Sequence, residues 1–488
     1  MENYYKNYNK SFINGKWIHG DIDSKKTDIL NPYNNEVLTS VTLASLDQIR
    51  GAFIIAEEAQ KDWAHSSVEE RKEMFTKMAE YFQNNKDEMI KVASKETGGT
   101  LLKAELEINL TIDVLKETFK YMDALDEVKE IPSSIEGKIN RVYRQPLGVI
   151  SSISPFNFPM NLSMRSIAPA IALGNTVVHK ADLQVAMTGG SIIARAFEYA
   201  GLPAGVFQSI LTRTSEIGDE MMENPVIQLV AFTGSTAVGK HIGEVAGRNL
   251  KRVALELGGN NPFIVLEDAE VDKAVDAAIF GKFIHQGQIC MCINRIIVHE
   301  KLYDAFTKKF IERAKQLPYG DQTNPNTVIG PLINEKQLAK VQEIIEQAKQ
   351  DGIQLGLEGK RDGNILTPYV FVDVDNNSEL AQSELFSPVV SIIKAKTDDH
   401  AIELANDTIY GLTSAVFTSD LKKGEAYGLK IDSGMTHVND QTVNDAANIP
   451  FGGNKQSGMG RFGDPWVIDE FTKLKWISVQ EKYREFPF

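Results

Sequence analysis

The strongest constraint on the fold is a stretch in which apolar, strand-like runs alternate with helix-like segments. We predict strands at residues 149–154, 176–178, 206–211, 226–232 and 252–255. We predict helices between them, at residues 160–173, 187–200 and 237–246. Strands separated by helices of this length join one parallel sheet through right-handed crossovers, so this part of the chain should form a sheet of the Rossmann type.

The rest of the chain predicts additional elements around this sheet. A chain of 488 residues is too long for one core, so two or three domains are expected. Ser67 and Glu70 fit a capping box that opens a helix, and Asn334 fits the cap of another helix that ends at Gly352. Apolar and polar residues alternate over 472–480, which predicts an edge strand.

Composition excludes several classes of function. The formal net charge of −14 argues against nucleic acid as a main partner, and no run approaches the roughly 18 apolar residues of a membrane span. The start of the chain lacks the basic and apolar segments of a signal peptide, and two cysteines in a chain this long indicate a reducing compartment. The eight histidines show no metal-ligand spacing. We therefore expect a cytoplasmic protein without a membrane span or a metal site.

Three short segments carry the chemistry. Gly234 and Ser235 lie in a strand-to-helix turn whose backbone N–H groups can meet a phosphate. Glu256 follows in Leu-Glu-Leu-Gly-Gly, and Cys290 follows later in Gly-Gln-Ile-Cys. A thiol is a strong nucleophile and a carboxylate with a raised pKa can activate water, so the pair predicts formation and hydrolysis of a thioester. Cys292 competes with Cys290 on chemical grounds.

Seven motifs in a fixed order resemble those of the NAD(P)-dependent aldehyde dehydrogenase superfamily over nearly the whole chain. They are Pro-Phe-Asn-Phe-Pro at 155–159, Val-Val-His-Lys at 177–180, Phe-Thr-Gly-Ser at 232–235, Leu-Glu-Leu-Gly-Gly at 255–259, Gly-Gln-Ile-Cys at 287–290, Glu-Leu-Phe-Ser-Pro at 384–388 and Pro-Phe-Gly-Gly at 450–453. Each motif is weak alone, and the ordered set is highly specific. Within the superfamily, residues 439–445 are similar to benzaldehyde and vanillin dehydrogenases.

The resemblance implies an α/β fold in three parts. A Rossmann-type parallel-sheet domain for the cofactor would comprise residues 1–123 and 147–256, and a second, catalytic α/β domain would comprise residues 257–467. A small β flap for oligomerisation, residues 124–146 and 468–488, implies a homodimer or homotetramer. The implied reaction oxidises a small-molecule aldehyde to the carboxylic acid with NAD or NADP, through a cysteine thiohemiacetal and a thioester.

The resemblance also implies roles for individual residues. Cys290 matches the nucleophile, which ranks it above Cys292, while Glu256 matches the general base and Asn157 the oxyanion donor. The residues that match the cofactor site are Ser154, Phe156, Lys180, Phe232, Gly234, Ser235, Glu384 and Phe386. The residues that match the aldehyde tunnel are Phe158, Leu162, Arg165, Ile284, Ile289 and Met291.

Departures from the family pattern leave the choice between NAD and NADP open. Leu183 stands where many NAD-preferring members carry a glutamate that grips the ribose hydroxyls and would repel a 2′-phosphate. Arg213 stands in a loop that usually contains glycines, and it could contact a phosphate or point to water. Ser387 and Phe156 replace a glycine and a tryptophan, and these small changes should not abolish catalysis.

Two classes of aldehyde fit the predicted tunnel. Its apolar residues suit a flat aromatic aldehyde, whereas in semialdehyde dehydrogenases an arginine placed like Arg165 binds the distal carboxylate. Arg165 could equally pair with an interior acid. An acylating enzyme that uses coenzyme A is disfavoured because Glu256 would hydrolyse the thioester. A catalytically silent binding protein is disfavoured because Cys290, Glu256, Asn157 and Lys180 are all present.

Overall fold

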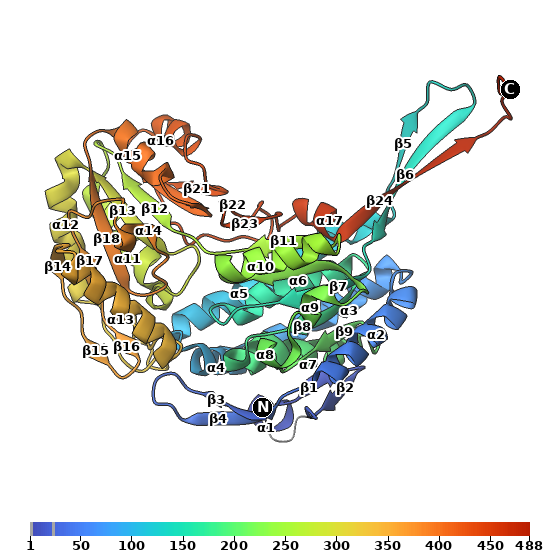
Figure 1. Ribbon diagram of the computed structural model, residues 1–488, viewed down its shortest axis with the longest axis horizontal. Coiled ribbons are helices and arrows are strands. Elements are labelled where there is room, and N and C mark those ends of the chain that lie inside the picture. Colours follow the sequence, from blue (N-terminus) through green and yellow to red (C-terminus); the bar gives the residue numbers. More distant parts are fainter. Residues whose placement is uncertain (1–2, 22–24) are drawn as a thin grey trace.

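The computed structural model describes residues 3–21 and 25–488, which form two α/β units and a projecting arm (Figure 1). The N-terminal strands are β1 (Ser11–Ile13), β2 (Lys16–Ile18), β3 (Lys26–Leu30) and β4 (Val37–Thr42). The N-terminal helices are α1 (Tyr4–Asn7), α2 (Leu46–Trp63), α3 (Val68–Asn84), α4 (Lys86–Thr97) and α5 (Leu101–Tyr121). The predicted capping box opens α3, where Ser67 and Glu70 exchange side chain-to-backbone hydrogen bonds.

The first large sheet has the strand order β2-β1-β9-β8-β7-β10-β11-β23. Its parallel centre consists of β7 (Val149–Ile153), β8 (Thr176–Lys180), β9 (Phe207–Ser209), β10 (Ile227–Thr233) and β11 (Arg252–Glu256). The helices between these strands are α6 (Pro159–Ala172), α7 (Ile192–Ala200), α8 (Thr214–Ile217), α9 (Glu220–Glu223) and α10 (Thr236–Arg248). The predicted Rossmann-type parallel sheet is therefore confirmed.

One predicted helix begins differently from expectation. Residues Met187–Ser191 form a π-helical turn, and α7 starts only at Ile192. The buried Glu96 carboxylate on α4 accepts the backbone N–H groups of Met187 and Thr188. This acceptor comes from a distant part of the chain, so the altered turn has no local sequence signal.

The strand order creates a topological switch point between β7 and β10. From β7 the chain runs outward through β8 and β9 on one side, and β10 and β11 lie on the other side. The loops that follow β7 and β10 therefore leave the same edge of the sheet, and the chain continues from them toward opposite sides. A crevice at such a point is the usual ligand site of an open parallel sheet.

The second large sheet has the strand order β14-β17-β18-β13-β12-β20-β21. Its strands are β12 (Asn261–Val265), β13 (Ile293–His299), β14 (Leu355–Leu357), β17 (Tyr369–Phe371), β18 (Val389–Ala395), β20 (Thr413–Phe417) and β21 (Met435–Val438). Its helices are α11 (Val271–Phe283), α12 (Glu300–Lys315), α13 (Glu335–Gln350), α14 (Glu379–Gln382), α15 (Asp398–Asn406) and α16 (Leu421–Gly428). Asn334 caps α13 as predicted, because its side chain accepts the N–H of Gln337 at 2.8 Å.

Small sheets complete the fold and form the arm. The short pairs are β15 (Arg361–Asp362) with β16 (Ile365–Leu366) and β19 (Tyr410–Gly411) with β22 (Asn454–Lys455), while β23 (Gly458–Met459) joins the edge of the first sheet. After α17 (Trp466–Phe471), β24 (Thr472–Gln480) pairs with β6 (Lys138–Pro146), which pairs with β5 (Val128–Pro132). This three-stranded arm projects away from both α/β units (Figure 1). The predicted edge strand is β24.

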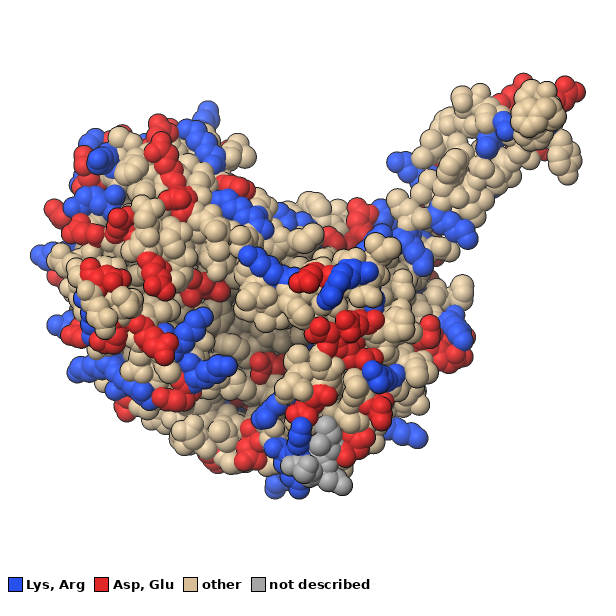
Figure 2. Space-filling model, in the orientation of Figure 1, with Lys and Arg blue, Asp and Glu red and all other residues tan. Residues whose placement is uncertain are grey.

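Apolar packing is concentrated on the two large sheets. Separate buried clusters lie on the faces of each sheet, and a smaller apolar cluster around Phe158, Ile289 and Phe451 lies between the units. On the face shown in Figure 2, acidic and basic side chains are interspersed rather than gathered in one patch. Within 3–21 and 25–488, no helix combines the length and apolar character that a bilayer crossing requires.

Candidate active site

Two cavities meet at Cys290 and Asn157, which line both of them. The first cavity has a volume of about 180 Å³, and its wall includes Phe156, Gly234, Ser235, Glu384 and Phe386. The second has a volume of about 270 Å³, and its wall includes Phe158, Leu162, Arg165, Ile284, Ile289 and Met291. The structure thus places five of the eight predicted cofactor residues on one side of Cys290 and the predicted aldehyde residues on the other.

The loop that carries Cys290 is held in an unusual backbone conformation. His285, Gln286 and Gly287 have φ angles of 51°, 56° and 75°, and a Cβ atom on Gly287 would lie 2.2 Å from the carbonyl oxygen of Ser387. Side-chain bonds fix this conformation, since Gln286 donates to the carbonyl oxygens of Gly98 and Pro331. Gly287 of the Gly-Gln-Ile-Cys motif is therefore required for two reasons: its φ angle is positive, and a side chain would collide with the Ser387 carbonyl oxygen.

The two cysteines differ in access. Cys290 is partly exposed, whereas Cys292 is buried and lines neither cavity. Burial, together with the nearby Glu384 and Glu256 carboxylates, raises the pKa of the Cys290 thiol to about 12. Cys292 instead lies beside the buried Lys282, whose Nζ is 3.5 Å from its Sγ. Of the two thiols, Cys290 is the one that faces both cavities.

Glu256 ends β11 and is only 3% exposed. Neither of its carboxylate oxygens has a hydrogen-bond partner among the described residues. Burial raises the pKa of Glu256 to about 8, with Arg165 and Arg461 opposing the shift and Asp445 reinforcing it. A buried carboxyl group with this pKa is ionised, and can accept a proton from water as a general base requires, mainly at and above about pH 8.

A buried ion pair supports the loop that carries Asn157. The Nζ of Lys103 lies 2.5 Å from Glu107, and both side chains are fully buried. The other Glu107 oxygen accepts the N–H of Met160 at 2.7 Å, in the first turn of α6. Lys103 also lies 4.4 Å from the centre of the Phe158 ring. These contacts fix the segment between β7 and α6, and therefore the position of Asn157.

The residues on the first cavity fit a dinucleotide. α10 begins beside the cavity, and Ser235 caps it by accepting the N–H of Val238. Glu384 accepts the N–H of Gly259 at 3.0 Å, and a Cβ atom on Gly258 would lie 2.6 Å from the Glu384 carboxylate. The close backbone approach and the open helix N-terminus suit a ligand that carries ribose and phosphate groups.

A third hollow of about 260 Å³ contains Lys180 at the end of β8, together with Leu183 and Arg213. Arg213 is exposed and lines this hollow, so it is open to water and also close to Lys180. Ser154 and Phe232 lie behind the cavity walls. The Ser154 hydroxyl accepts a hydrogen bond from Ser163 at 2.7 Å, and the Phe232 ring fills the space beside Gly234.

The second cavity also contains residues that sequence reasoning did not identify. They are Leu106, Leu110, Asn161, Phe280, Gln441, Val443, Asn444, Asp445 and Phe451. Arg165 forms an ion pair with Asp445 in this wall. This is the alternative in which Arg165 pairs with an acid in the protein interior. The i, i+4 spacing of Leu106 and Leu110 on α5 could have indicated a shared apolar face. Gln441, Val443, Asn444 and Asp445 lie in the 439–445 stretch that is similar to benzaldehyde and vanillin dehydrogenases, and Phe451 lies in the Pro-Phe-Gly-Gly motif.

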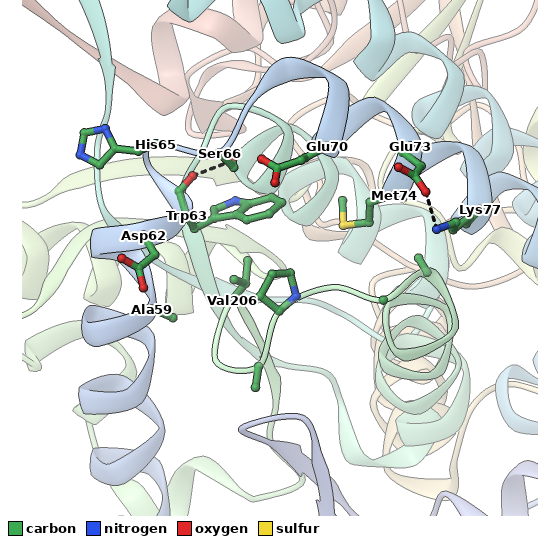
Figure 3. Close-up of a pocket in the computed structure, with 14 residues that line it drawn as sticks. Ala59, Asp62, Trp63, His65, Ser66, Glu70, Glu73, Met74, Lys77 and Val206 are labelled. Atoms are coloured by element: carbon green, nitrogen blue, oxygen red, sulfur yellow. Dashed lines mark hydrogen bonds and ion pairs between the residues drawn. The ribbon is translucent and has the colours of Figure 1, made fainter.

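A larger hollow of about 530 Å³ lies elsewhere, between α2, α3 and the loop after α7 (Figure 3). Its wall contains none of the predicted site residues. Three of its polar side chains are engaged locally, since Lys77 pairs with Glu73 at 2.7 Å and the Ser66 hydroxyl donates to the Trp63 carbonyl oxygen at 2.7 Å. The candidate site is therefore the smaller pair of cavities at Cys290.

Known proteins match this chain over nearly its whole length. The sequence profile of the aldehyde dehydrogenase family matches residues 17–477. AldY of Bacillus subtilis (strain 168) is 64% identical over 484 residues, which cover 99% of this chain and 100% of AldY. The benzaldehyde dehydrogenase YfmT of the same strain is 44% identical over 484 residues and 99% of both chains. The crystal structure of an NAD-dependent benzaldehyde dehydrogenase from Corynebacterium glutamicum superimposes with a TM-score of 0.90 at 41% identity, over 99% of both chains.

Proposed function

Because the chain belongs to the aldehyde dehydrogenase family, we propose that it oxidises aromatic aldehydes to carboxylic acids with Cys290 as the nucleophile. The observation that carries this proposal is the position of Cys290 between a cavity suited to a dinucleotide and an apolar cavity of about 270 Å³. Phe158, Ile289, Phe451 and their apolar neighbours offer a surface for a flat ring. Similarity to a benzaldehyde dehydrogenase over 99% of the chain supports the same substrate class.

Each catalytic group has one task in the proposed mechanism. Cys290 attacks the aldehyde carbon, and the Asn157 amide with the backbone N–H of Cys290 stabilises the oxyanion of the thiohemiacetal. The bound nicotinamide cofactor supplies the hydride acceptor for the oxidation, which leaves a thioester on Cys290. Glu256 takes a proton from water and the resulting hydroxide attacks the thioester carbon. The carbon–sulfur bond then breaks, and the proton held by Glu256 returns to the Cys290 sulfur as the carboxylic acid leaves.

The test is a comparison of initial rates with benzaldehyde, vanillin, succinic semialdehyde and a short aliphatic aldehyde, each with NAD⁺ and with NADP⁺. We expect higher kcat/KM values for the two aromatic aldehydes. A preference for succinic semialdehyde would move the protein to the semialdehyde alternative, with Arg165 as the ligand of the distal carboxylate. Equal and low rates with every aldehyde would overturn the aromatic assignment.

Cofactor choice depends on the hollow around Lys180, and we propose that it accepts NADP⁺ as well as NAD⁺. Leu183 brings no negative charge into this hollow, and Arg213 brings a positive one. The substitution Leu183→Glu is expected to lower kcat/KM for NADP⁺ on the order of tenfold or more relative to NAD⁺, because a carboxylate repels a 2′-phosphate. The check is steady-state kinetics with both cofactors. An equal loss with both would show that residue 183 does not face the ribose.

We further propose a separate function for each of three parts of the chain. Residues 1–123 and 147–256 hold the cofactor, residues 257–467 supply the thiol, and residues 124–146 and 468–488 join subunits into a homodimer or homotetramer. The exposed Leu474 and Trp476, which are 64% and 67% accessible, support the last role. Both cysteines are free, which supports the proposal that the protein acts in the reducing cytoplasm.

The arm gives a prediction about assembly. Leu474 and Trp476 project from the same face of β24, because side chains two residues apart in a strand share a face. The double substitution Leu474→Glu and Trp476→Glu is expected to shift the protein to a smaller species in sedimentation velocity, since it places charges in the subunit contact. Lys475→Gln, on the opposite face, is the matched control. An unchanged sedimentation coefficient in the double variant would remove the arm from the interface.

A further inference from the structure

The wall of the aldehyde cavity contains one charged pair among apolar and uncharged polar side chains. Arg165 on α6 and Asp445, which follows β21, form an ion pair whose side chains are 7% and 8% exposed. The Arg165 guanidinium also lies 3.8 Å from the centre of the Phe451 ring, which fixes its plane. Both charged residues line the same cavity as Cys290, Leu162 and Ile289. A substrate that enters this cavity therefore passes an arginine whose charge is already compensated.

One N–H donor group of Arg165 has no acceptor in this pair. The Nη1 of Arg165 is buried and has no hydrogen-bond partner within the described part of the chain, whereas its Nη2 donates to Asp445. Asn161 donates to the same Asp445 oxygen at 3.3 Å. The Asp445 carboxylate thus binds one nitrogen of the Arg165 guanidinium and adds a negative charge to the cavity wall. A guanidinium without that partner would be a strong site for a second carboxylate.

We propose that Asp445 is a specificity-determining residue, which masks Arg165 and so excludes aldehydes that carry a carboxylate at the far end. This inference rests on the proposed function, because it concerns the far wall of the aldehyde cavity. A neutral ring meets a pair with no net charge and apolar neighbours. A distal carboxylate must instead lose its hydration beside the Asp445 carboxylate, and the donor that it finds on Arg165 belongs to a guanidinium whose charge Asp445 already compensates. The masking explains how the chain keeps an arginine in this position and still favours uncharged aldehydes.

The test compares benzaldehyde with 4-carboxybenzaldehyde, which differ only by the distal carboxylate. The wild-type protein should use benzaldehyde with the higher kcat/KM. In Asp445→Asn, the amide keeps the size of the side chain and an acceptor oxygen for Arg165 and Asn161 but removes the charge. The ratio of kcat/KM for 4-carboxybenzaldehyde to that for benzaldehyde should then rise by about 10–100-fold, the range expected for a hydrogen bond to a charged group. Asp445→Ala should raise the ratio in the same direction.

Two further variants separate masking from a loss of structure. Asp440→Asn removes a charge from an exposed neighbour in the same loop, and the substrate ratio should stay at its wild-type value. The double variant Arg165→Met with Asp445→Asn leaves no charge in the wall, and it should lose the gain seen in Asp445→Asn. Thermal unfolding of each variant reports whether the fold persists.

The outcomes for the two proposals are distinct. If the wild-type protein does not oxidise benzaldehyde, the proposed aromatic function fails. If it oxidises benzaldehyde and 4-carboxybenzaldehyde equally well, the masking proposal fails while the aromatic function stands. The masking proposal also fails if folded Asp445→Asn and Asp445→Ala proteins keep the wild-type ratio, or if the double variant keeps the gain.

Discussion

Replacing Cys290 with alanine is expected to reduce aldehyde oxidation to background, a loss of about 10⁴-fold or more for removal of a covalent nucleophile. The reason is that no thiohemiacetal can form, so the hydride has no activated donor carbon. Binding of NAD⁺ or NADP⁺ should persist, because Cys290 contributes only part of the wall of the dinucleotide cavity. The measurement combines steady-state rates with a titration of cofactor binding by calorimetry.

The matched control is Cys292→Ala. This thiol is buried beside Lys282 and lines neither cavity, so most of the activity should remain. Some loss of stability is expected, because a buried sulfur is replaced by a smaller group. Full activity in Cys290→Ala together with inactive Cys292→Ala would reverse the assignment of the nucleophile.

Replacing Glu256 with glutamine is expected to separate the two halves of the reaction. Cys290 can still form the thioester, so one equivalent of reduced cofactor per site should appear in a burst. Hydrolysis then lacks its general base, and the steady rate should fall by roughly 10²–10⁴-fold. Stopped-flow absorbance of the reduced cofactor resolves the burst from the steady phase. Undiminished steady turnover would remove Glu256 from the role of base.

The raised pKa of Glu256 sets the direction of the pH dependence. Burial raises this pKa to about 8, so the carboxyl group is mostly protonated below that pH and cannot accept a proton from water. The wild-type kcat should therefore rise as the pH increases through about 8, provided that thioester hydrolysis limits turnover. A rate independent of pH between 6 and 9, measured in the same constant-ionic-strength buffer, would contradict this assignment.

The first sheet could be predicted from the sequence because its signals are local. Apolar runs of strand length alternate with helical periods, and the elements from β7 to β11 follow that alternation. The capping residues Ser67 and Asn334 also act within four residues of the helices that they begin. Each of these features depends on neighbours in the chain, so one sequence was sufficient to identify it.

The features that the sequence did not predict depend on distant partners. Glu96 on α4 accepts the N–H groups of the π-helical turn before α7, and Asp445 reaches Arg165 across a sequence separation of 280 residues. No local pattern specifies which acid neutralises an arginine in the tunnel. The sequence therefore left two alternatives for Arg165, a substrate carboxylate or an interior acid, and only the folded structure shows the pair with Asp445. The proposed catalytic residues could be named from the sequence only because they lie in short motifs with a characteristic order.

In the proposed mechanism an aromatic aldehyde is carried as a thioester on Cys290. This intermediate can be detected by mass spectrometry of the Glu256→Gln protein after brief exposure to benzaldehyde and NAD⁺, followed by peptide mapping of the acid-quenched sample. We expect one benzoyl group per chain, attached to Cys290 and absent when the cofactor is left out. A benzoyl group on Cys292, or reduced cofactor in the burst without any acylated cysteine, would contradict the proposed mechanism.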